Sequence, residues 1–290
     1  LGGETLGAAG LIEIKRRIKS VENTRKITKA MNVVATSKLR KVREELNKNE
    51  DYYNLSKEIL KKIVASLPED YESPFLNNLS KNLTDSKLYI VITSDAGFCG
   101  GFNSNIVNTL NDSIEDKDSA KFIVAGLRGI QYMRKVGLKA YKEYIELPDI
   151  PTSKEVRAIY DEALFMFKSK EVSEVNIVYT EYSSAISQEI KIEKIFPVDI
   201  EKEEAEELII EPNLENVLSS SLDSYLKSKI RRVMLHSKAS EHNARMKTMD
   251  SSTDNAEEIL KSLNTNYNRI RQGMITQEIS EIVGGAEALK

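Results

Sequence analysis

The sequence has little from which a disulfide scaffold or a metal site could be built. Its 290 residues include one cysteine, two histidines and no tryptophan. A single cysteine excludes an internal disulfide framework and any zinc site made from several cysteines, and it fits a reducing compartment. With 13 glycines and 6 prolines, the chain is also neither collagen-like nor of low complexity.

Long apolar runs are missing as well. The run from Leu88 to Ile92 is far shorter than the ~20 residues of a membrane-spanning helix, and the first residues lack the apolar core of a signal peptide. We therefore expect a soluble protein that docks, if at all, on a membrane complex. Its length favours about two domains.

Charge, in contrast, is abundant. Lys and Arg number 42 and Asp and Glu number 45, so that 30% of the residues are charged while the net charge is only −3. The 40% hydrophobic content is below the roughly 45–50% usual for globular chains. This balance favours long exposed helices over one compact core.

Two stretches near the ends of the chain have the heptad spacing of coiled-coil helices. Residues 11–67 contain no proline or glycine, and Pro68 then ends the pattern. The first seam is interrupted at Arg25, Thr28 and Asn32, and it consists of Ile14, Ile18, Val21, Arg25, Thr28, Asn32, Ala35, Leu39, Val42, Leu46, Asn49, Tyr53, Ser56, Leu60, Ile63 and Leu67.

The second helix is predicted over residues 212–290, with Pro212 in a first helical turn. Its seam consists of Met246, Met249, Thr253, Ala256, Leu260, Leu263, Tyr267, Ile270 and Met274. Because one helix opens the chain and the other closes it, we expect an antiparallel pair.

The middle of the chain alternates between strand and helix patterns. Strands are expected at 88–93, 121–125, 175–182 and 186–196, the last two as a hairpin, and helices at 103–114, 129–136 and 156–167. This order predicts a three-layer α/β, Rossmann-like domain with a partly parallel sheet. The predicted divisions are a flexible 1–10, a helix over 11–67, a linker over 68–87, the central domain over 88–196, an acidic linker and foot over 197–211, and a helix with its tip over 212–290.

Candidate catalytic groups are few. The glycine-rich loop Asp95 to Asn103 follows a strand and precedes a helix, where backbone amides can cradle a phosphate, but it has no lysine and matches neither GxxxxGK[ST] nor GxGxxG. His236 and His242 are six residues apart, so we expect them on different faces of a helix, at its surface or an interface. Cys99 is expected to be an inert turn residue. The residues predict no enzyme, no cofactor and no metal site.

The charge is segregated along the chain. Residues 11–48 carry twelve basic and four acidic side chains, residues 225–247 carry seven and one, and residues 199–211 carry one and seven. Basic helices of this kind bind nucleic acid or an acidic protein surface, or are simply solvated. Against nucleic acid, the first basic stretch has no aromatic residue before Tyr52 on which bases could stack.

Three blocks of sequence resemble the gamma subunit family of F-type ATP synthases. They are Lys26 to Met31 (KITKAM) with Val33 to Arg40 (VVATSKLR), the glycine loop, and a C-terminal set formed by Ser240 to Met246 (SEHNARM), Thr253 to Ala256 (TDNA), Tyr267-Asn268, Arg271 to Glu278 (RQGMITQE) and Glu281 to Gly284 (EIVG). The blocks occur in the family's order along nearly the whole chain.

The resemblance implies a non-catalytic rotor shaft. Its helix pair would thread a hexamer of alternating alpha and beta subunits, three of each, with catalytic sites on beta. Its α/β domain would lie near the epsilon subunit and the ring of c subunits. The chain has only Cys99 and so lacks the regulatory cysteine insertion of chloroplast relatives, which favours a bacterial form. In such a form the chain would be peripheral on the cytoplasmic side of the plasma membrane. Nucleic acid would not be a partner.

The resemblance also assigns residues to three contact surfaces. The residues that would contact the alpha and beta subunits are Lys29, Met31, Arg245, Arg271, Gln272, Thr276 and Glu278. An apolar tip that turns against its partners would consist of Met274, Ile275, Ile279, Ile282, Val283 and Leu289. The foot on the c ring would be Leu208, Ile210 and Glu211, where the family commonly has Tyr, Tyr and Glu, so that only Glu211 matches.

The chain departs from the family at Ala96 too, where an arginine is common. On the residues alone, a basic coiled-coil protein that binds or tethers nucleic acid is the main alternative to the rotor, and an enzyme built on the glycine loop ranks third.

Overall fold

The computed structural model describes the backbone of residues 2–68, 71, 73–76, 84–200 and 208–288, and side chains from residue 10 to residue 287 within those ranges. Its contacts divide the chain into two compact units. The helix-pair unit comprises Leu1–Val34 and Met246–Lys290, and the body unit comprises Ala35–Arg245. Two long helices, α1 (Gly2–Ala65) and α5 (Leu214–Ala288), contribute to both units.

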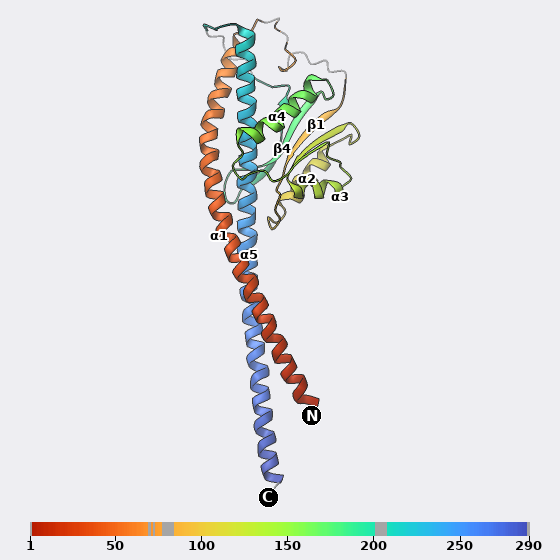
Figure 1. The fold of residues 1–290 in the computed structure, drawn as a ribbon, viewed down its shortest axis with the longest axis vertical. Coiled ribbons are helices and arrows are strands. Elements are labelled where there is room, and N and C mark those ends of the chain that lie inside the picture. Colours follow the sequence, from red (N-terminus) through yellow and green to blue (C-terminus); the bar gives the residue numbers. More distant parts are fainter. Residues whose placement is uncertain (1, 69–70, 72, 77–83, 201–207, 289–290) are drawn as a thin grey trace. The chain divides into compact units, whose positions relative to one another are not determined.

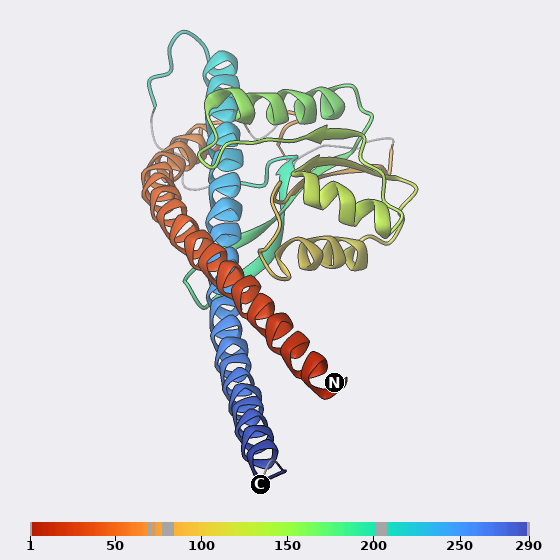
Figure 2. The same ribbon diagram turned by 60° about the horizontal axis from the view of Figure 1, so that its bottom comes forward.

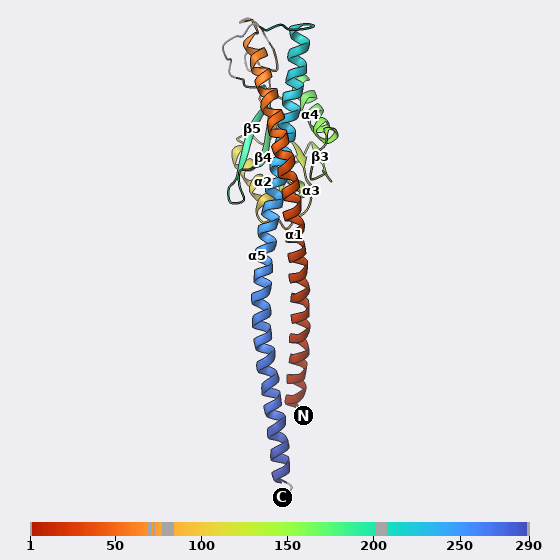
Figure 3. The ribbon, with the colours of Figure 1, turned by 90° about the vertical axis from the view of Figure 1, so that its left-hand side faces the viewer.

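The helix-pair unit is an antiparallel pair of the first part of α1 and the last part of α5 (Figure 3). In both units together, each predicted seam position from Ile14 to Leu67 and from Met246 to Met274 is buried or half-buried. The heptad spacing therefore located the packed face of both helices, because residues three and four apart lie on one stripe of a helix.

The three interruptions of the first seam pair with α5. Thr28 and Thr253 share a hydroxyl–hydroxyl hydrogen bond of 2.8 Å, and the amide of Asn32 donates to the Met246 carbonyl at 3.1 Å. Arg25 faces Glu257 at 3.4 Å at the exposed edge of the seam. As the residue number falls on α1 it rises on α5, which is the signature of antiparallel pairing.

The body unit contains a five-stranded sheet in the order β3-β2-β1-β4-β5. The strands are β1 (Lys87–Ile92), β2 (Ala120–Ala125), β3 (Lys142–Tyr144), β4 (Glu174–Tyr182) and β5 (Gln188–Phe196). All adjacent pairs are parallel except β4 and β5, which form an antiparallel hairpin. Strand β1 lies at the centre, pairing Leu88 with Lys121 of β2 and with Val175 of β4.

Helices cover both faces of the sheet (Figures 1 and 2). Helices α2 (Phe102–Ser113) and α3 (Leu127–Lys135) pack on the face that presents Tyr89 and Val91. Helix α4 (Ser153–Lys168) and the body-unit parts of α1 and α5 pack on the face that presents Leu88 and Ile90. Successive residues of β1 thus enter different cores, which makes the unit three-layered.

Polar contacts join α1 to α5 within the body unit. The buried Asn49 amide donates to the Ser228 carbonyl at 3.2 Å, and Arg232 faces Glu50 at 2.7 Å. The rings of Tyr53 and Tyr225 stack with centroids 5.6 Å apart. These contacts fix the pairing of the two helices over the sheet.

The structure differs from the sequence prediction in four places. Helix α5 begins at Leu214, so Pro212, which was expected in the first helical turn, precedes the helix. Strand β3 was not predicted, because its three residues are half-buried or exposed and give no apolar run. Helix α1 begins at Gly2, so residues expected to be flexible are helical. The compact units also do not end where the helices end, because residues 35–65 and 214–245 pack on the sheet and belong with it.

Candidate functional site

The surface of the helix-pair unit carries most of the predicted partner contacts. Lys29 of α1 is exposed, and so are Arg271, Gln272, Thr276 and Glu278 of α5, whereas Met31 is half-buried. The Thr276 hydroxyl donates to the Gln272 carbonyl one turn earlier, at 2.9 Å. These side chains are available to another molecule within the unit as the structure describes it.

The end of α5 presents uncovered apolar side chains. Ile275, Ile279 and Ile282 recur at helical spacing and are 46%, 57% and 71% exposed, and Val283 beside them is 54% exposed. Met274 is half-buried in the seam, and Leu289 lies outside the described residues. An apolar stripe of this kind, which the described part of the chain does not cover, is typical of a contact surface.

Arg245 is placed differently from the other predicted contacts. It lies in the body unit and is 7% exposed. Its guanidinium donates to the Gly97 and Ala96 carbonyls, both at 3.1 Å, and pairs with Glu241 at 2.9 Å. The side chain therefore binds the glycine loop and is not exposed at the surface.

A network of charges surrounds Arg245. The buried Glu241 carboxylate also faces Lys238 at 3.0 Å. His242, almost fully buried, bonds Asp149 at 2.8 Å, and Lys38 of α1 reaches the same carboxylate at 2.9 Å. The hydrogen bond from His242, followed by that from Lys38, holds the pKa of Asp149 well below its ordinary value of 3.8 although burial opposes the shift.

Sequence reasoning did not find this network. Lys238, Glu241 and Arg245 follow helical spacing and could have been recognised as one group. Asp149 gave no signal, because it reaches α5 only through the fold. The histidine expectation was wrong: His236 and His242 are both buried, since α1 and the sheet together enclose this part of α5. Burial, with the positive charge of Arg232 adding to it, lowers the pKa of His236 below 6.5.

Much of the basic charge of α5 is neutralised inside the body unit. Six of the seven basic residues between Tyr225 and Lys247 have an acidic partner within 4 Å, namely Lys227, Lys229, Arg231, Arg232, Lys238 and Arg245. The basic stretch over residues 225–247 is therefore not a free cationic surface. The cations of α1 in the helix-pair unit, in contrast, are largely exposed, including Lys15, Arg16, Lys26 and Lys29.

The predicted foot is only partly described. Leu208 and Glu211 are exposed and Ile210 is half-buried. Residues 201–207, which carry much of the acidic charge of this segment, lie outside the described residues. Leu208 and Glu211 are thus open to contact.

The glycine loop is organised by side chains. Asn103 accepts from the Ser94 amide at 3.0 Å, and Asp95 accepts from the Leu127 amide at 3.0 Å. Cys99 is buried, and the Asn103 amide donates to its sulfur at 3.2 Å. Burial raises the pKa of the thiol, so it is not activated as a nucleophile.

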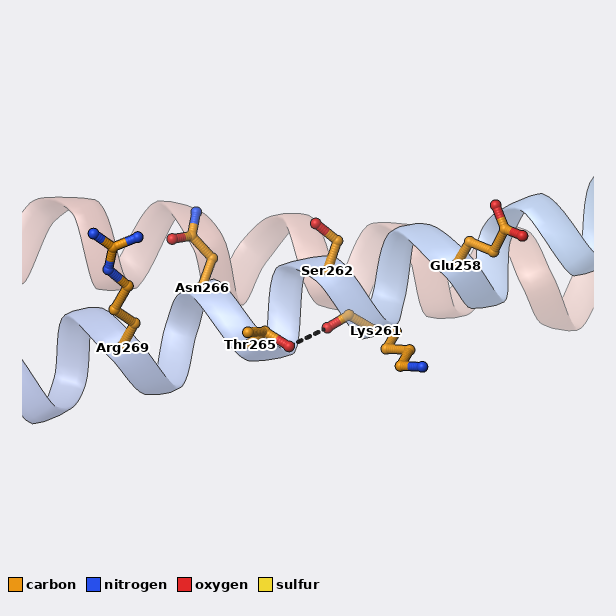
Figure 4. A pocket seen from close by; sticks show the side chains of 6 residues that line it. All are labelled: Glu258, Lys261, Ser262, Thr265, Asn266 and Arg269. Carbon is orange, nitrogen blue, oxygen red and sulfur yellow. Dashed lines mark hydrogen bonds between the residues drawn. The ribbon is translucent and has the colours of Figure 1, made fainter.

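A surface groove on α5 offers no enclosed site. Figure 4 shows its lining, and all the side chains concerned are exposed: Glu258, Lys261, Ser262, Thr265, Asn266 and Arg269. No group of three or more histidine, cysteine or acidic side chains in the described ranges could hold a metal ion. None of the helices within those ranges is both long enough and apolar enough to cross a membrane.

Comparisons with known proteins agree with this architecture. The ATP synthase family model described as ATP-synt matches residues 10–289. The ATP synthase gamma chains of Clostridium botulinum and Clostridium beijerinckii are each 47% identical to this chain over 98% of its length, covering 100% and 99% of the relatives. A chain in the Euglena gracilis mitochondrial ATP synthase structure containing OSCP, F1 and the c ring has a TM-score of 0.69 at 18% identity, covering 97% of this chain and 95% of that one.

Proposed function

The chain belongs to the ATP synthase gamma chain family, and on that premise we propose that it is the central rotor shaft of an F-type ATP synthase. It couples ion-driven rotation of a c ring to conformational changes at catalytic sites on beta subunits, and it performs no catalysis itself. The observation that carries the proposal is the 47% identity to gamma chains over 98% of the sequence. The complex lies on a bacterial plasma membrane, with this chain peripheral on the cytoplasmic side.

The helix-pair unit supplies the contacts with alpha and beta. Exposed charged and polar groups such as Lys29, Arg271, Gln272 and Glu278 meet the loops of the surrounding subunits, since exposed ion pairs cost little to break and re-form. A shaft must favour different conformations of otherwise identical partners at each angle, so its contacts must differ around its circumference. Arg245 acts within the body and contributes to these contacts only through the loop that it binds.

The uncovered stripe of Ile275, Ile279 and Ile282 serves as the apolar tip, with Val283 beside it. Contacts between apolar side chains are non-directional, and they can slide without breaking hydrogen bonds. Leu208, Ile210 and Glu211 contact the c ring, and the epsilon subunit binds beside them. The basic nucleic-acid-binding alternative loses the part of its support that came from residues 225–247, because the charge of that stretch is largely paired within the body unit.

The decisive experiment is purification of the intact complex through an affinity tag on this chain. We expect one copy to co-purify with three alpha and three beta subunits, with epsilon and with the c ring. Recovery of the chain alone, or with nucleic acid whose binding weakens steeply as the salt concentration rises, would reject the rotor.

A second experiment tests the apolar tip. An Ile279→Ser/Ile282→Ser variant should assemble, because both side chains are exposed, yet it should lower rotation-coupled ATP hydrolysis. Thr265→Ser on the same helix is the control.

A further inference from the structure

The strand order of the body unit defines a ligand crevice. From β1 the chain proceeds to β2 and β3 on one side, and β4 then joins β1 on the other side. In open α/β sheets, ligands bind at the carboxyl ends of the two strands where the order reverses. Here those ends are Ile92 of β1 and the Thr180–Tyr182 end of β4, which are parallel neighbours.

Helix α5 occupies this crevice with polar side chains. The Ser237 hydroxyl donates to the Ile92 carbonyl at 3.2 Å, and the Ser240 hydroxyl donates to the Thr180 carbonyl at 3.1 Å. His236 accepts from the Tyr182 amide at 3.3 Å, and Asn243 donates to the Ala185 carbonyl at 3.0 Å. Each bond joins an α5 side chain to backbone at the carboxyl edge of the sheet.

The small side chains of α5 permit this close approach. Ser237 is 2% exposed, and Ser240 and the neighbouring Ala239 are fully buried. A buried hydroxyl that donates to a strand-end carbonyl has its own hydrogen bond satisfied, and burial makes the loss of that bond costly. The helix is therefore fixed both in its position along its axis and in its rotation about that axis.

The glycine loop beside the crevice has the wrong polarity for a phosphate. Dinucleotide sites present backbone N–H groups to the pyrophosphate at this turn. In this chain the carbonyls of Ala96 and Gly97 point at a cation, the Arg245 guanidinium, whose remaining contacts are Glu241 and His242. The Arg245 side chain of helix α5 occupies the place that a nucleotide would need.

We propose that this crevice is a socket for the chain's own helix, and that it forms the joint through which the α/β body and α5 turn together. The inference rests on the proposed rotor function and deepens it. Ser237 and Ser240 are positioning residues of the joint, and Arg245 locks the adjacent loop to the same helix. The crevice is thus filled by a fixed intramolecular docking of α5.

The test uses the intact membrane complex carrying Ser237→Ala/Ser240→Ala. The control is Ser220→Ala/Ser224→Ala, two exposed serines of the same helix. Both complexes are reconstituted in vesicles, and the number of ions moved per ATP hydrolysed is measured against a rising opposing gradient. We expect the control to match wild type and the crevice variant to lose at least twofold in this ratio at high load, with ATP hydrolysis itself preserved.

Hydrogen exchange of peptides covering residues 236–245 gives a second readout in the assembled complex. Exchange should be several-fold faster in the crevice variant, because α5 opens from the sheet more often. Equal pumping ratios and equal exchange in the two double variants would overturn the proposal.

If the double variant fails to assemble, Arg245→Lys replaces it. A lysine keeps the charge, but its single nitrogen cannot reproduce the planar fork with which separate nitrogens of Arg245 reach the Gly97 carbonyl and the Ala96 carbonyl with Glu241. An unchanged pumping ratio and unchanged exchange in that variant would equally reject the joint. Failure of the wild-type chain to join alpha and beta subunits would instead refute the rotor function, so the two failures are distinguishable.

Discussion

The hydroxyls of Thr28 and Thr253 lie 2.8 Å apart across the seam of the helix-pair unit, where a coiled coil ordinarily has two apolar side chains. One of the two hydroxyls donates to the other, and the accepting hydroxyl can donate its own proton to a local carbonyl, that of Arg25 for Thr28 or of Met249 for Thr253. A polar pair at a seam position specifies the register of two helices at some cost in stability. The pair therefore selects one alignment of α1 with α5.

A double-mutant cycle should measure that bond. Thr28→Val and Thr253→Val each remove one partner, and we expect the coupling free energy between them to be about 0.5–1.5 kcal/mol in denaturant unfolding. The matched cycle combines Thr28→Val with Thr276→Val, an exposed threonine, and should be additive. Coupling below about 0.3 kcal/mol in the first cycle would show that the hydroxyls act independently.

Asp149 should make stability depend on pH in the acid range. Its pKa is depressed in the folded chain, so the ionised carboxylate stabilises the fold above its ordinary pKa of 3.8, and this contribution is lost as the pH falls towards the folded pKa. We expect Asp149→Asn to be less stable than wild type at pH 7 and the gap to narrow below pH 3.8. Asp254→Asn, at an exposed position, should show no such gap in urea titrations at each pH.

His236 should produce a second pH dependence with its own window. Because burial lowers its pKa below 6.5, the unfolded chain takes up the proton first as the pH falls. Stability from the neutral ring is therefore complete above pH 6.5 and is lost below it.

We expect His236→Phe to be less stable than wild type by about 1–3 kcal/mol at pH 7.5, since the buried Tyr182 amide loses its acceptor. That gap should shrink at pH 5.5, as measured by the denaturant midpoint. A gap that stays constant would mean that the ring is not buried in its neutral form.

Two glycines offer a matched pair of alanine substitutions. A Cβ on Gly129 would lie 2.1 Å from the Thr93 hydroxyl and 2.8 Å from the Thr93 Cβ, whereas a Cβ on Gly273 would meet nothing within 4 Å. Gly129→Ala should destabilise the body unit by about 1–3 kcal/mol through overpacking. Gly273→Ala should stabilise α5 by up to about 1 kcal/mol. Thermal unfolding of both variants checks the opposite signs.

Much of the fold could be predicted because it follows from periodicity. Ala35, Leu39 and Val42 are buried where the heptad frame places them, and Ile90 and Val91 face different cores as adjacent strand residues must. The short β3 could not be predicted, since Lys142 to Tyr144 form a strand only because β2 provides an edge with which to pair.

The site was predicted less completely than the fold. Exposure of Arg271 and Glu278 follows from their positions outside the seam. For Arg245 and His242 a surface position was the natural expectation on a charged helix, but the sheet edge and Asp149 enclose them. Long-range pairings such as Lys38 with Asp149 depend on the tertiary fold, and no local pattern contains them.

The spacing of the second seam has a mechanical consequence. From Met246 to Met274 the half-buried and buried positions repeat every 3.5 residues on average, while a straight helix repeats every 3.6. Keeping these residues in contact over four heptads requires a left-handed supercoil, since a straight helix would drift by about 80°. Torque of one sense winds such a pair tighter and torque of the other sense unwinds it. We therefore expect the torsional stiffness of such a shaft to differ between its two senses of rotation.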